Sequence, residues 1–521
     1  MRARGRWIAA GLGIAAAALV GAVGLALLGG EERPAPTPAP PVSRPTIVQD
    51  DAVLLHRSDA ETRTSIAELA ALGVDWVRIT AGWSVIAPDP TSPIRPDFDA
   101  EDPGAYPPGA WDTLDRAVRL ADEAGMRVLV DIAFWAPRWA VARTSTPPDR
   151  QRDGIDPRQY AAFAAAVARR YSGREDLPEA VAFAVWNEPN YPIFMLPQWR
   201  PVDRGPGTEQ DGWAADSPRQ YRAMLRAAAP RIRAAAPGAL VLIGNTAALG
   251  AADPGRSTDG VPPLEFMREL ACVDRQMQPL TTPDCRGFQP LPGDGWAHHP
   301  YSLDLPPWRQ DPQPDNVRLG DLRRMADLLD RLSDAGRTER RLGLWITEYG
   351  YQTDPPDPTQ RVTPALQARW LPEAERRALA DTRVRSFSQF LLRDLPERAG
   401  ATLRARWGDF QSGLLFPDGR PKPARRAFAY SLALRRAGPR AVSVWMHVRP
   451  GRGPRDVRLA VASPDVEGGW RTVAAFGVRR TDAEGYLEAT VSADPRATYR
   501  LEVREGGAWR PGEPVAGASA Q

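Results

Sequence analysis

Two glutamates stand directly after short apolar runs in this sequence. Residues 181–187 (VAFAVWN) lead into Glu188, and residues 342–347 (LGLWIT) lead into Glu348. Short apolar runs of this kind are typical of buried strands, so both carboxylates are expected at strand ends. Two carboxylates that face each other across a cleft can cleave a glycosidic bond, one as the acid and the other as nucleophile or base. A turn or a surface acid would also account for either glutamate alone.

Other polar side chains are expected beside this pair. Asn187 precedes the first glutamate, and Arg78 lies within an apolar run of its own, WVRIT, where a structural ion pair is the alternative. His299 and Tyr301 end a further run. His298 and His299 are adjacent and must point to opposite faces of a strand, so we expect His299 in the site and His298 packed.

The chain contains 17 tryptophans, several of which follow predicted strands. Sugars present apolar C–H faces on which flat aromatic rings stack, which makes Trp83, Trp135 and Trp139 candidates for sugar subsites. Packing in the core or in loops is the alternative for each of them. Asp131, at the end of another apolar run, fits either the mouth of the fold or its core.

Strand-like and helical segments alternate between residues 46 and 438. Eight such repeats favour an α/β fold, a (β/α)8 TIM barrel with long loops, over a doubly wound sheet, which would show a glycine-rich phosphate loop after its first strand. Catalytic groups of such barrels lie at the C-terminal ends of the strands, and the two glutamates then end strands four and seven. The predicted strands are Ala52–Leu55, Trp76–Thr80, Arg127–Ile132, Val181–Trp186, Leu240–Gly244, Gly295–His299, Leu342–Thr347 and Val384–Leu391. The predicted helices are Ala60–Leu72, Trp111–Ala124, Pro157–Tyr171, Pro218–Ala235, Pro263–Cys272, Val317–Ala335, Leu371–Ala380 and Ala424–Arg435.

The pattern changes after residue 438. Short runs with a period of two, separated by Gly, Asp and Pro, predict a small all-β sandwich over residues 439–511 as an accessory domain, with a tail over 512–521. Its aromatic residues fit a core better than a sugar-binding platform.

The N-terminus predicts an extracytoplasmic protein. Three arginines within the first six residues precede residues 8–30, which are 23 residues without a charge and long enough to span a bilayer. The positive flank is expected to stay inside, so residues 1–30 are predicted to be a signal anchor that holds the chain in the membrane; a cleaved signal peptide, followed by secretion, is the alternative. The proline-rich residues 31–45 then form a linker.

The composition restricts the other partners and groups. A net charge of +3 on 521 residues leaves no electrostatic footprint for nucleic acid. The two cysteines, Cys272 and Cys285, are expected to form a disulfide outside the cytoplasm, two unrelated thiols being the alternative. With four histidines and no Cys or His spacing typical of zinc sites, neither a metal nor a cofactor is expected. We expect a monomer.

Several motifs together resemble those of clan A retaining glycoside hydrolases of the family 5 and family 39 type. The motifs are residues 186–189 (WNEP), 346–350 (ITEYG), 299–301 (HPY) and 413–423 (GLLFPDGRPKP), together with Arg78. The resemblance implies double displacement at an O-glycosidic bond, most simply a β bond in a polysaccharide or oligosaccharide. It implies that Glu188 is the acid/base and Glu348 the nucleophile, that Asn187 holds the sugar 2-hydroxyl, and that Tyr301 donates a hydrogen bond to Glu348.

The eighth predicted strand departs from that pattern. Many clan A members carry a tryptophan at its end, and residues 384–392 contain none. Gln389 or Phe387 is expected to take that place, or Trp407 to reach in from the following loop. Two other functions remain open for the same fold: a non-catalytic carbohydrate-binding or envelope scaffold, and a transglycosylase or phosphorylase that uses the same site.

Overall fold

The computed structural model describes residues 44–518 except 146, 149, 175, 203–211, 452 and 464–467. The described residues belong to one compact unit, Val42–Gln521. The predicted membrane segment at 8–30 and most of the linker at 31–45 lie outside them, as does the end of the tail. Within the described ranges, no helix combines the length and apolar character needed to cross a bilayer.

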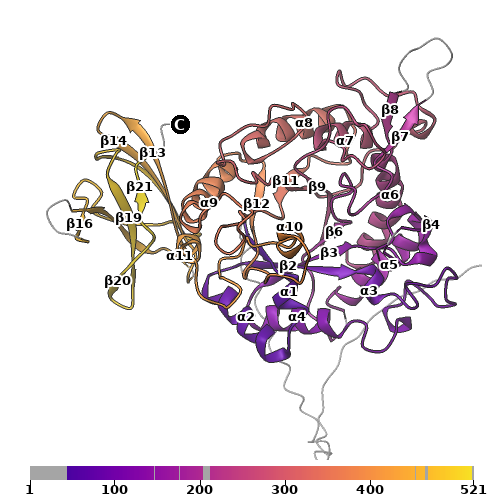
Figure 1. The fold of residues 1–521 in the computed structure, drawn as a ribbon, viewed down its shortest axis with the longest axis horizontal. Coiled ribbons are helices and arrows are strands. Elements are labelled where there is room, and N and C mark those ends of the chain that lie inside the picture. Colours follow the sequence, from indigo (N-terminus) through magenta and orange to yellow (C-terminus); the bar gives the residue numbers. More distant parts are fainter. Residues whose placement is uncertain are drawn as a thin grey trace, which may run out of the picture. The chain divides into compact units, whose positions relative to one another are not determined.

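Eight parallel strands close into a barrel, and helices surround it (Figure 1). Around the barrel the order is β1-β12-β11-β10-β9-β6-β3-β2, so each strand neighbours the next one along the chain and the last pairs with the first. This closed order confirms the TIM barrel, in which β6 and β11 are strands four and seven. The barrel strands are β1 (Thr46–Gln49), β2 (Trp76–Gly82), β3 (Arg127–Ala133), β6 (Ala182–Val185), β9 (Leu240–Ala247), β10 (Gly295–His299), β11 (Gly343–Ile346) and β12 (Val384–Phe390).

The first strand differs from the prediction. Residues 52–55, predicted as a strand, lie mostly in the short helix α1 (Asp51–Leu54), and the strand is β1, four residues that are all buried. Asp50 lies between β1 and α1 and caps the helix, because its side chain accepts a hydrogen bond from the backbone N–H of Val53. The apolar run correctly indicated that these residues are buried, but it wrongly indicated a strand instead of a helix.

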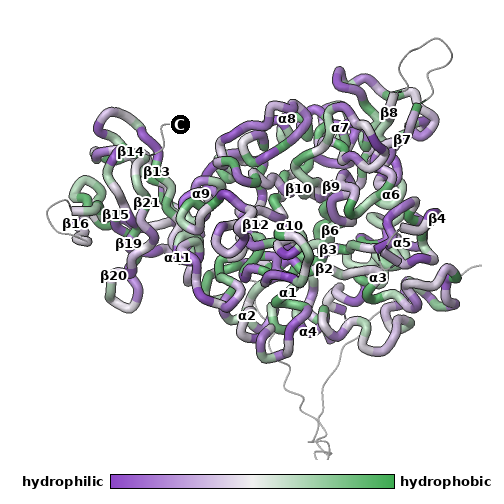
Figure 2. The backbone as a smooth tube through the Cα atoms, viewed as in Figure 1, coloured by the Kyte–Doolittle hydropathy of each residue, from purple (hydrophilic) through white to green (hydrophobic). Residues whose placement is uncertain are grey.

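The helices bury one face against the barrel. In α4, Leu114, Val118 and Ala121 recur at helical spacing and are buried, and the hydropathy along the surrounding helices alternates accordingly (Figure 2). Most predicted helices match within a few residues, but α9 begins earlier, at Pro364, because the side chain of Thr363 caps it. The helices are α1 (Asp51–Leu54), α2 (Asp59–Ala71), α3 (Trp83–Ile86), α4 (Asp112–Glu123), α5 (Pro157–Arg170), α6 (Ser217–Ala235), α7 (Pro263–Leu270), α8 (Leu322–Asp334), α9 (Pro364–Leu379), α10 (Leu403–Arg406) and α11 (Pro423–Ala429).

Two further sheets follow the barrel. One has the order β13-β14-β18, and the other is built on β16-β15-β19-β20, to which β17 and β21 add. Leu432 and Val444 from the first sheet share a hydrophobic core with Leu459 and Leu501 from the second. The strands are β13 (Tyr430–Gly438), β14 (Ala441–Val448), β15 (Asp456–Ala462), β16 (Trp470–Thr472), β17 (Val478–Arg480), β18 (Tyr486–Ser492), β19 (Thr498–Glu505), β20 (Ala508–Pro511) and β21 (Val515–Ala516).

The helix predicted over 424–435 is wrong in its second half. It ends at Ala429, and Tyr430–Gly438 continues as strand β13, which pairs antiparallel with β14. Pairing with β14 makes this segment a strand, because an apolar run of this length is compatible with a helix or a strand. The all-β region thus begins at residue 430 rather than 439.

Buried charges join this region to the barrel. Glu375 on α9 accepts from the ring of His447 on β14, with 2.7 Å between Oε1 and Nδ1, and pairs with Arg449 at 2.6 Å. Arg449 also donates to the Thr46 hydroxyl on β1. A disulfide joins Cys272 and Cys285, as predicted, and closes the loop that follows α7.

Candidate active site

The chain leaves the barrel in an unusual backbone conformation where β6 ends. Trp186 and Glu188 have positive φ angles of 61° and 39°, which side chains other than glycine rarely adopt. Two buried tyrosines support this segment: the Tyr160 hydroxyl accepts from the backbone N–H of Trp186, and the Tyr221 hydroxyl donates to the carbonyl of Val185. Such strained residues cluster at functional sites, where surrounding contacts hold them.

The following residues complete a tight turn. Pro189 comes directly after Glu188, and the backbone N–H of Tyr191 donates to the carbonyl of Glu188. Asn190 ties the turn to the loop after β9, because its amide donates to the carbonyls of Ala247 and Val261. The Asn-Glu-Pro-Asn sequence thus makes a turn whose side chains also fix it to the next barrel strand.

Glu348 extends from the end of β11 and is held at both oxygens. The guanidinium of Arg78 lies 2.5 Å from Oε1, and the hydroxyl of Tyr301 donates to Oε2 at 2.9 Å. The hydrogen bond from Tyr301 confirms what the resemblance implied. Charge-assisted donors of this kind fix the orientation of a carboxylate.

Arg78 lies inside the barrel on β2 and has no exposed surface. Besides Glu348, its guanidinium donates to Asp131 on β3 and to the side-chain oxygen of Asn187, each at 2.9 Å, and to Gln49 on β1. Burial lowers the pKa of Arg78, but the carboxylates of Asp131 and Glu348 raise it more, so the guanidinium stays charged. Asp131 is fully buried beneath the mouth, which places it in the core rather than on the cleft surface.

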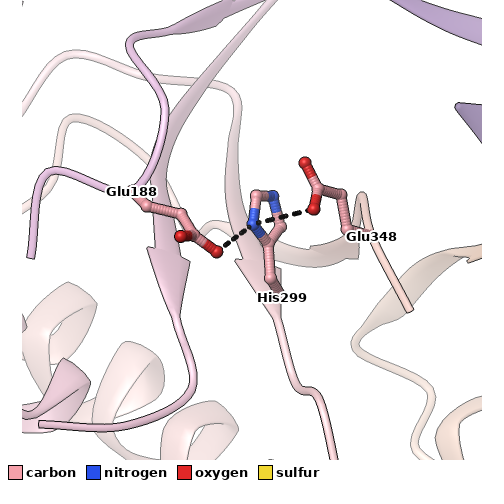
Figure 3. A group of neighbouring side chains, drawn as sticks. All are labelled: Glu188, His299 and Glu348. Carbon is pink, nitrogen blue, oxygen red and sulfur yellow. Dashed lines mark hydrogen bonds and ion pairs between the residues drawn. The ribbon is translucent and has the colours of Figure 1, made fainter. Parts of the chain in front are cut away.

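His299 lies between the two glutamates (Figure 3). Its Nδ1 is 2.8 Å from Oε1 of Glu188 and 3.7 Å from Oε2 of Glu348, while its Nε2 is 3.0 Å from the side-chain oxygen of Asn245. His298 points the other way and bonds to Thr246 and to the carbonyl of Val317. The structure therefore brings His299 into the site and packs His298, as the alternation along a strand predicted.

Burial determines the protonation of Glu188 and His299. Desolvation raises the pKa of Glu188 to about 7, and the charge of Arg78 only partly opposes this. Desolvation likewise lowers the pKa of His299 to about 3, so its ring is neutral. A glutamic acid whose pKa lies near neutrality can both give and take a proton.

Among the described residues, one group of side chains could hold a metal ion: Glu188, His299 and Glu348. Oxygens of Glu188 and Glu348 and a ring nitrogen of His299 lie within 4.8 Å of one another. A divalent cation there would compete with the positive charge of Arg78, which already occupies one oxygen of Glu348, and with Tyr301 on the other. The donor set therefore fits proton transfer better than metal binding, and we assign no metal to it.

The three candidate tryptophans have different positions. Trp83 is 1% exposed and packs on Phe163 and Tyr160 in the core, so its prediction as a subsite residue is wrong. Trp139 is half-buried, meets Trp83 edge-on and donates its indole N–H to the carbonyl of Pro88. An apolar side chain after a strand signals burial as readily as a sugar platform.

Trp135 is the candidate that contacts the loop after Glu188. Its indole N–H donates to the carbonyl of Ile193, on that loop, at 2.9 Å. Its ring stacks on Phe194, and the guanidinium of Arg150 lies over it at 4.5 Å. A sugar that stacked on Trp135 would have to share the ring with these two side chains.

Phe390 ends the eighth barrel strand, where the sequence left the choice between three other residues. Gln389 is buried and donates to the backbone carbonyls of Leu391 and Ser412, so its prediction as a substrate-binding residue is wrong. Phe387 is 3% exposed and packs on Tyr349. The ring of Phe390 instead meets Tyr301 edge-on, with 6.3 Å between centroids.

Trp407 follows the short helix α10 and is half-buried. The aromatic residue that joins Phe390 from this loop is Phe410, with centroids 5.1 Å apart. Sequence reasoning also missed Asn245. The alternation along β12 could have pointed to Phe390, but Asn245 carries no motif and is recognised only by its contacts.

A family model described as cellulase, glycosyl hydrolase family 5, matches residues 48–316, slightly more than half of the chain. No curated protein matches the sequence.

Solved structures resemble the chain at low identity. A family 39 glycoside hydrolase from Bacteroides cellulosilyticus WH2 is 14% identical, with 87% of this chain and 81% of that chain covered and a TM-score of 0.49. GH5_18 from Streptomyces cattleya, in complex with GlcNAc, is 19% identical, with 74% and 79% covered and a TM-score of 0.45. A monomeric beta-xylosidase from Caulobacter crescentus CB15 is 16% identical, with 87% and 97% covered and a TM-score of 0.48.

Proposed function

Because the chain belongs to the cellulase family, glycosyl hydrolase family 5, and is a glycoside hydrolase, we propose that it cleaves β-O-glycosidic bonds with retention of configuration. The observation that carries the proposal is the contrast between the two glutamates. Burial holds the pKa of Glu188 near 7, whereas Glu348 is bound by the guanidinium of Arg78 and the hydroxyl of Tyr301. Such a difference supports Glu188 as the acid and Glu348 as the nucleophile.

The spacing of the two groups supports double displacement. Each glutamate offers an oxygen within 4.8 Å of the other. Retaining enzymes hold their carboxyl groups ~5–5.5 Å apart, whereas inverting enzymes leave ~6.5–9.5 Å for a water molecule. The short spacing favours direct attack by one carboxylate on the sugar.

The reaction then has two steps. In the first, an oxygen of Glu348 attacks the anomeric carbon, the bond to the leaving oxygen breaks, and Glu188 gives its proton to that oxygen. In the second, Glu188 takes a proton from water, the water oxygen attacks the anomeric carbon, and Glu348 is released.

We assign three further side chains to sugar binding. The side-chain oxygen of Asn187 accepts from Arg78, which leaves its NH2 group as a donor for a sugar hydroxyl. Tyr191, 39% exposed, follows Glu188 on the same turn, and Phe410, 45% exposed, adjoins Phe390. These two exposed rings provide stacking surface that Trp83 does not.

Two substitutions test the assignment on aryl β-glycosides with good and poor leaving groups. Glu348→Gln is expected to abolish cleavage of both substrates, on the order of 10⁵-fold. In kcat/KM, which reports the first step, Glu188→Gln is expected to lose about 10²–10⁴-fold on the poor leaving group and far less on the good one, which needs no proton. Equal losses of kcat/KM on both substrates for Glu188→Gln would remove its assignment as the acid.

The anomer formed first, read by proton NMR, tests retention directly. A product with the configuration of the substrate is expected, and the opposite anomer would show single displacement. Product analysis with and without an added sugar acceptor separates the hydrolase from a transglycosylase. A digest of a glycan library by the full-length chain, read by mass spectrometry, identifies the sugar, the linkage and the endo or exo mode.

We also propose that residues 8–30 hold the enzyme at the outer face of the membrane, with an envelope polysaccharide or oligosaccharide as substrate. The support is the uncharged length of this segment and the arginines before it. Fractionation of cells that express the chain is expected to recover it with membranes, and deletion of residues 8–30 is expected to abolish this. Recovery of a shortened chain in the medium would instead show a cleaved signal peptide.

A further inference from the structure

Asn245, at the end of β9, connects the acid to the histidine. Its backbone has a positive φ of 48°, its carbonyl accepts from the backbone N–H of Glu188, and its side chain is fully buried. The side chain reaches His299 on the next strand, with 3.0 Å between Oδ1 and Nε2. Asn245 is therefore in contact with both members of the Glu188–His299 pair.

The orientation of the Asn245 amide is determined by its other partners. Its NH2 group lies 2.7 Å from the backbone carbonyl of Trp186, which can only accept, and 3.0 Å from a carboxyl oxygen of Asp131. The amide oxygen accordingly points to Thr347, whose hydroxyl donates to it at 3.1 Å, and to His299. An amide oxygen only accepts, so the hydrogen of the His299 ring must lie on Nε2.

This orientation decides what Nδ1 of His299 can do. A neutral ring with its hydrogen on Nε2 presents a lone pair at Nδ1, and that lone pair faces Oε1 of Glu188 at 2.8 Å. A hydrogen bond between these two atoms requires the proton to lie on Glu188. A carboxylate there would face a lone pair instead, so this arrangement favours the protonated acid that the first step of the reaction uses.

We propose that Asn245 is a positioning residue that fixes the Nε2–H tautomer of His299 and thereby keeps the catalytic proton on Glu188. This inference rests on the proposed function only in calling Glu188 the acid. Other ionisable groups also act on the pair: Arg78 from β2, Asp131 from β3, His298 from β10, Glu348 after β11, and Tyr301 and Tyr191 from the adjoining loops. None of them bonds to Nε2 of His299, so the tautomer depends on Asn245.

The tautomer can be measured without any turnover. In the full-length chain labelled with ¹⁵N-histidine, ring nitrogen shifts distinguish a protonated nitrogen from a bare one, and the chain has four histidines. At about one pH unit below the pKa of Glu188, about 7, His299 is expected to carry hydrogen on Nε2 alone. His447 donates from Nδ1 to Glu375, whose pKa is about 2, and is expected to show the opposite tautomer in the same spectrum. The variants His299→Gln and His447→Gln assign the signals. Hydrogen on Nδ1 of His299 in the parent would overturn the proposal.

Substitution of Asn245 tests its role. Asn245→Gly suits the positive φ and removes the acceptor, whereas Asn245→Asp keeps an acceptor in a residue that tolerates this backbone. Asn245→Gly is expected to populate the Nδ1–H tautomer and to move the basic limb of the kcat/KM profile down by about one pH unit, a loss of about tenfold on that limb. Asn245→Asp is expected to retain the Nε2–H tautomer.

Asn190→Ala is the matched control. It removes a buried asparagine from the same pair of loops that has no bond to His299, and its bonds run to Ala247 and Val261. It is expected to lower stability and to leave the basic limb in place. An unchanged tautomer in Asn245→Gly, or an equal movement of the limb in Asn190→Ala, would contradict the proposal. A chain without glycosidase activity would contradict the proposed function instead, and the tautomer measurement would still decide this one.

Discussion

The molecule contains two buried glutamate–histidine pairs that behave in opposite ways. At the barrel mouth, Glu188 lies 2.8 Å from Nδ1 of His299, and burial raises the pKa of the acid to about 7. Between α9 and β14, Glu375 lies 2.7 Å from Nδ1 of His447. There burial also raises the pKa of Glu375, but Arg449 and His447 lower it by more, so that it falls to about 2. The residue types and distances are alike, but the protonation differs, and Glu188 keeps 13% of its side chain exposed against 2% for Glu375.

The difference follows from the placement of one arginine. Arg449 bonds directly to Glu375, at 2.6 Å, whereas Arg78 bonds to Glu348 and only acts on Glu188 from a distance. A buried carboxylate with its own guanidinium is a structural ion, and a buried carboxylate without one is an acid. The barrel directs its central arginine to Glu348 and leaves Glu188 without a guanidinium of its own.

The largest effect is expected from Arg449→Met. It leaves Glu375 buried beside a neutral histidine, and removal of one partner of a buried pair costs about 3–5 kcal/mol of the free energy of unfolding. Denaturant unfolding at neutral pH measures the loss. The double variant Arg449→Met, Glu375→Gln is expected to recover part of it, and a double variant no more stable than the single one would show that the charge was not the cause.

The two pairs should also give stability curves of opposite slope. Glu375 has a folded pKa of about 2, below the usual 4.5, so its contribution is complete above pH 4.5 and is lost as the pH falls toward 2. Glu188 has a folded pKa of about 7, above the usual 4.5, so the cost of its ionisation is absent below pH 4.5 and grows as the pH rises to 7. Each difference corresponds to about 3 kcal/mol.

Glutamine variants reveal these slopes by denaturant unfolding at several pH values. Relative to the parent, Glu188→Gln is expected to gain stability between pH 4.5 and 7. The deficit of Glu375→Gln is expected to shrink between pH 4.5 and 2. Parallel curves for the two variants would mean that the pairs do not differ in protonation.

Tyr301→Phe tests Glu348, the glutamate at the barrel mouth that Arg78 binds. It removes one of two charge-assisted hydrogen bonds to Glu348, worth about 1.5–3 kcal/mol. We expect kcat/KM to fall by tenfold or more and the thermal midpoint to fall by several degrees, as measured by steady-state kinetics and calorimetry. An unaffected kcat/KM would show that Arg78 alone orients Glu348.

The smallest effect is expected at an exposed pair, which serves as the baseline. Arg63 and Glu123 lie 3.4 Å apart with 65% and 62% of their side chains exposed. Water screens such pairs, so Arg63→Ala should cost less than about 1 kcal/mol in unfolding experiments. A loss comparable to that of Arg449→Met would mean that burial is not what separates the two classes.

The site could be predicted from sequence as far as its residues carry local signals. Glu188, Glu348, His299 and Tyr301 stand at the ends of apolar runs, and the structure brings them together with Arg78. The aromatic residues were less predictable, because an apolar ring after a strand packs into the core, as Trp83 does, or faces the cleft according to its neighbours. Helix and strand were confused at 52–55 and 430–435, where short apolar runs fit both periods.

The sequence by itself determined the repeat of strands and helices, the barrel that follows from it, and the two carboxylates at the ends of strands four and seven. These are local properties, set by hydrophobic period and by where polar residues interrupt it. The tertiary structure alone decided which glutamate Arg78 binds and which atoms face the two ring nitrogens of His299. These properties depend on contacts between residues 50 to 270 positions apart, such as Asn245 with His299 and Arg78 with Glu348, and no local pattern records such contacts.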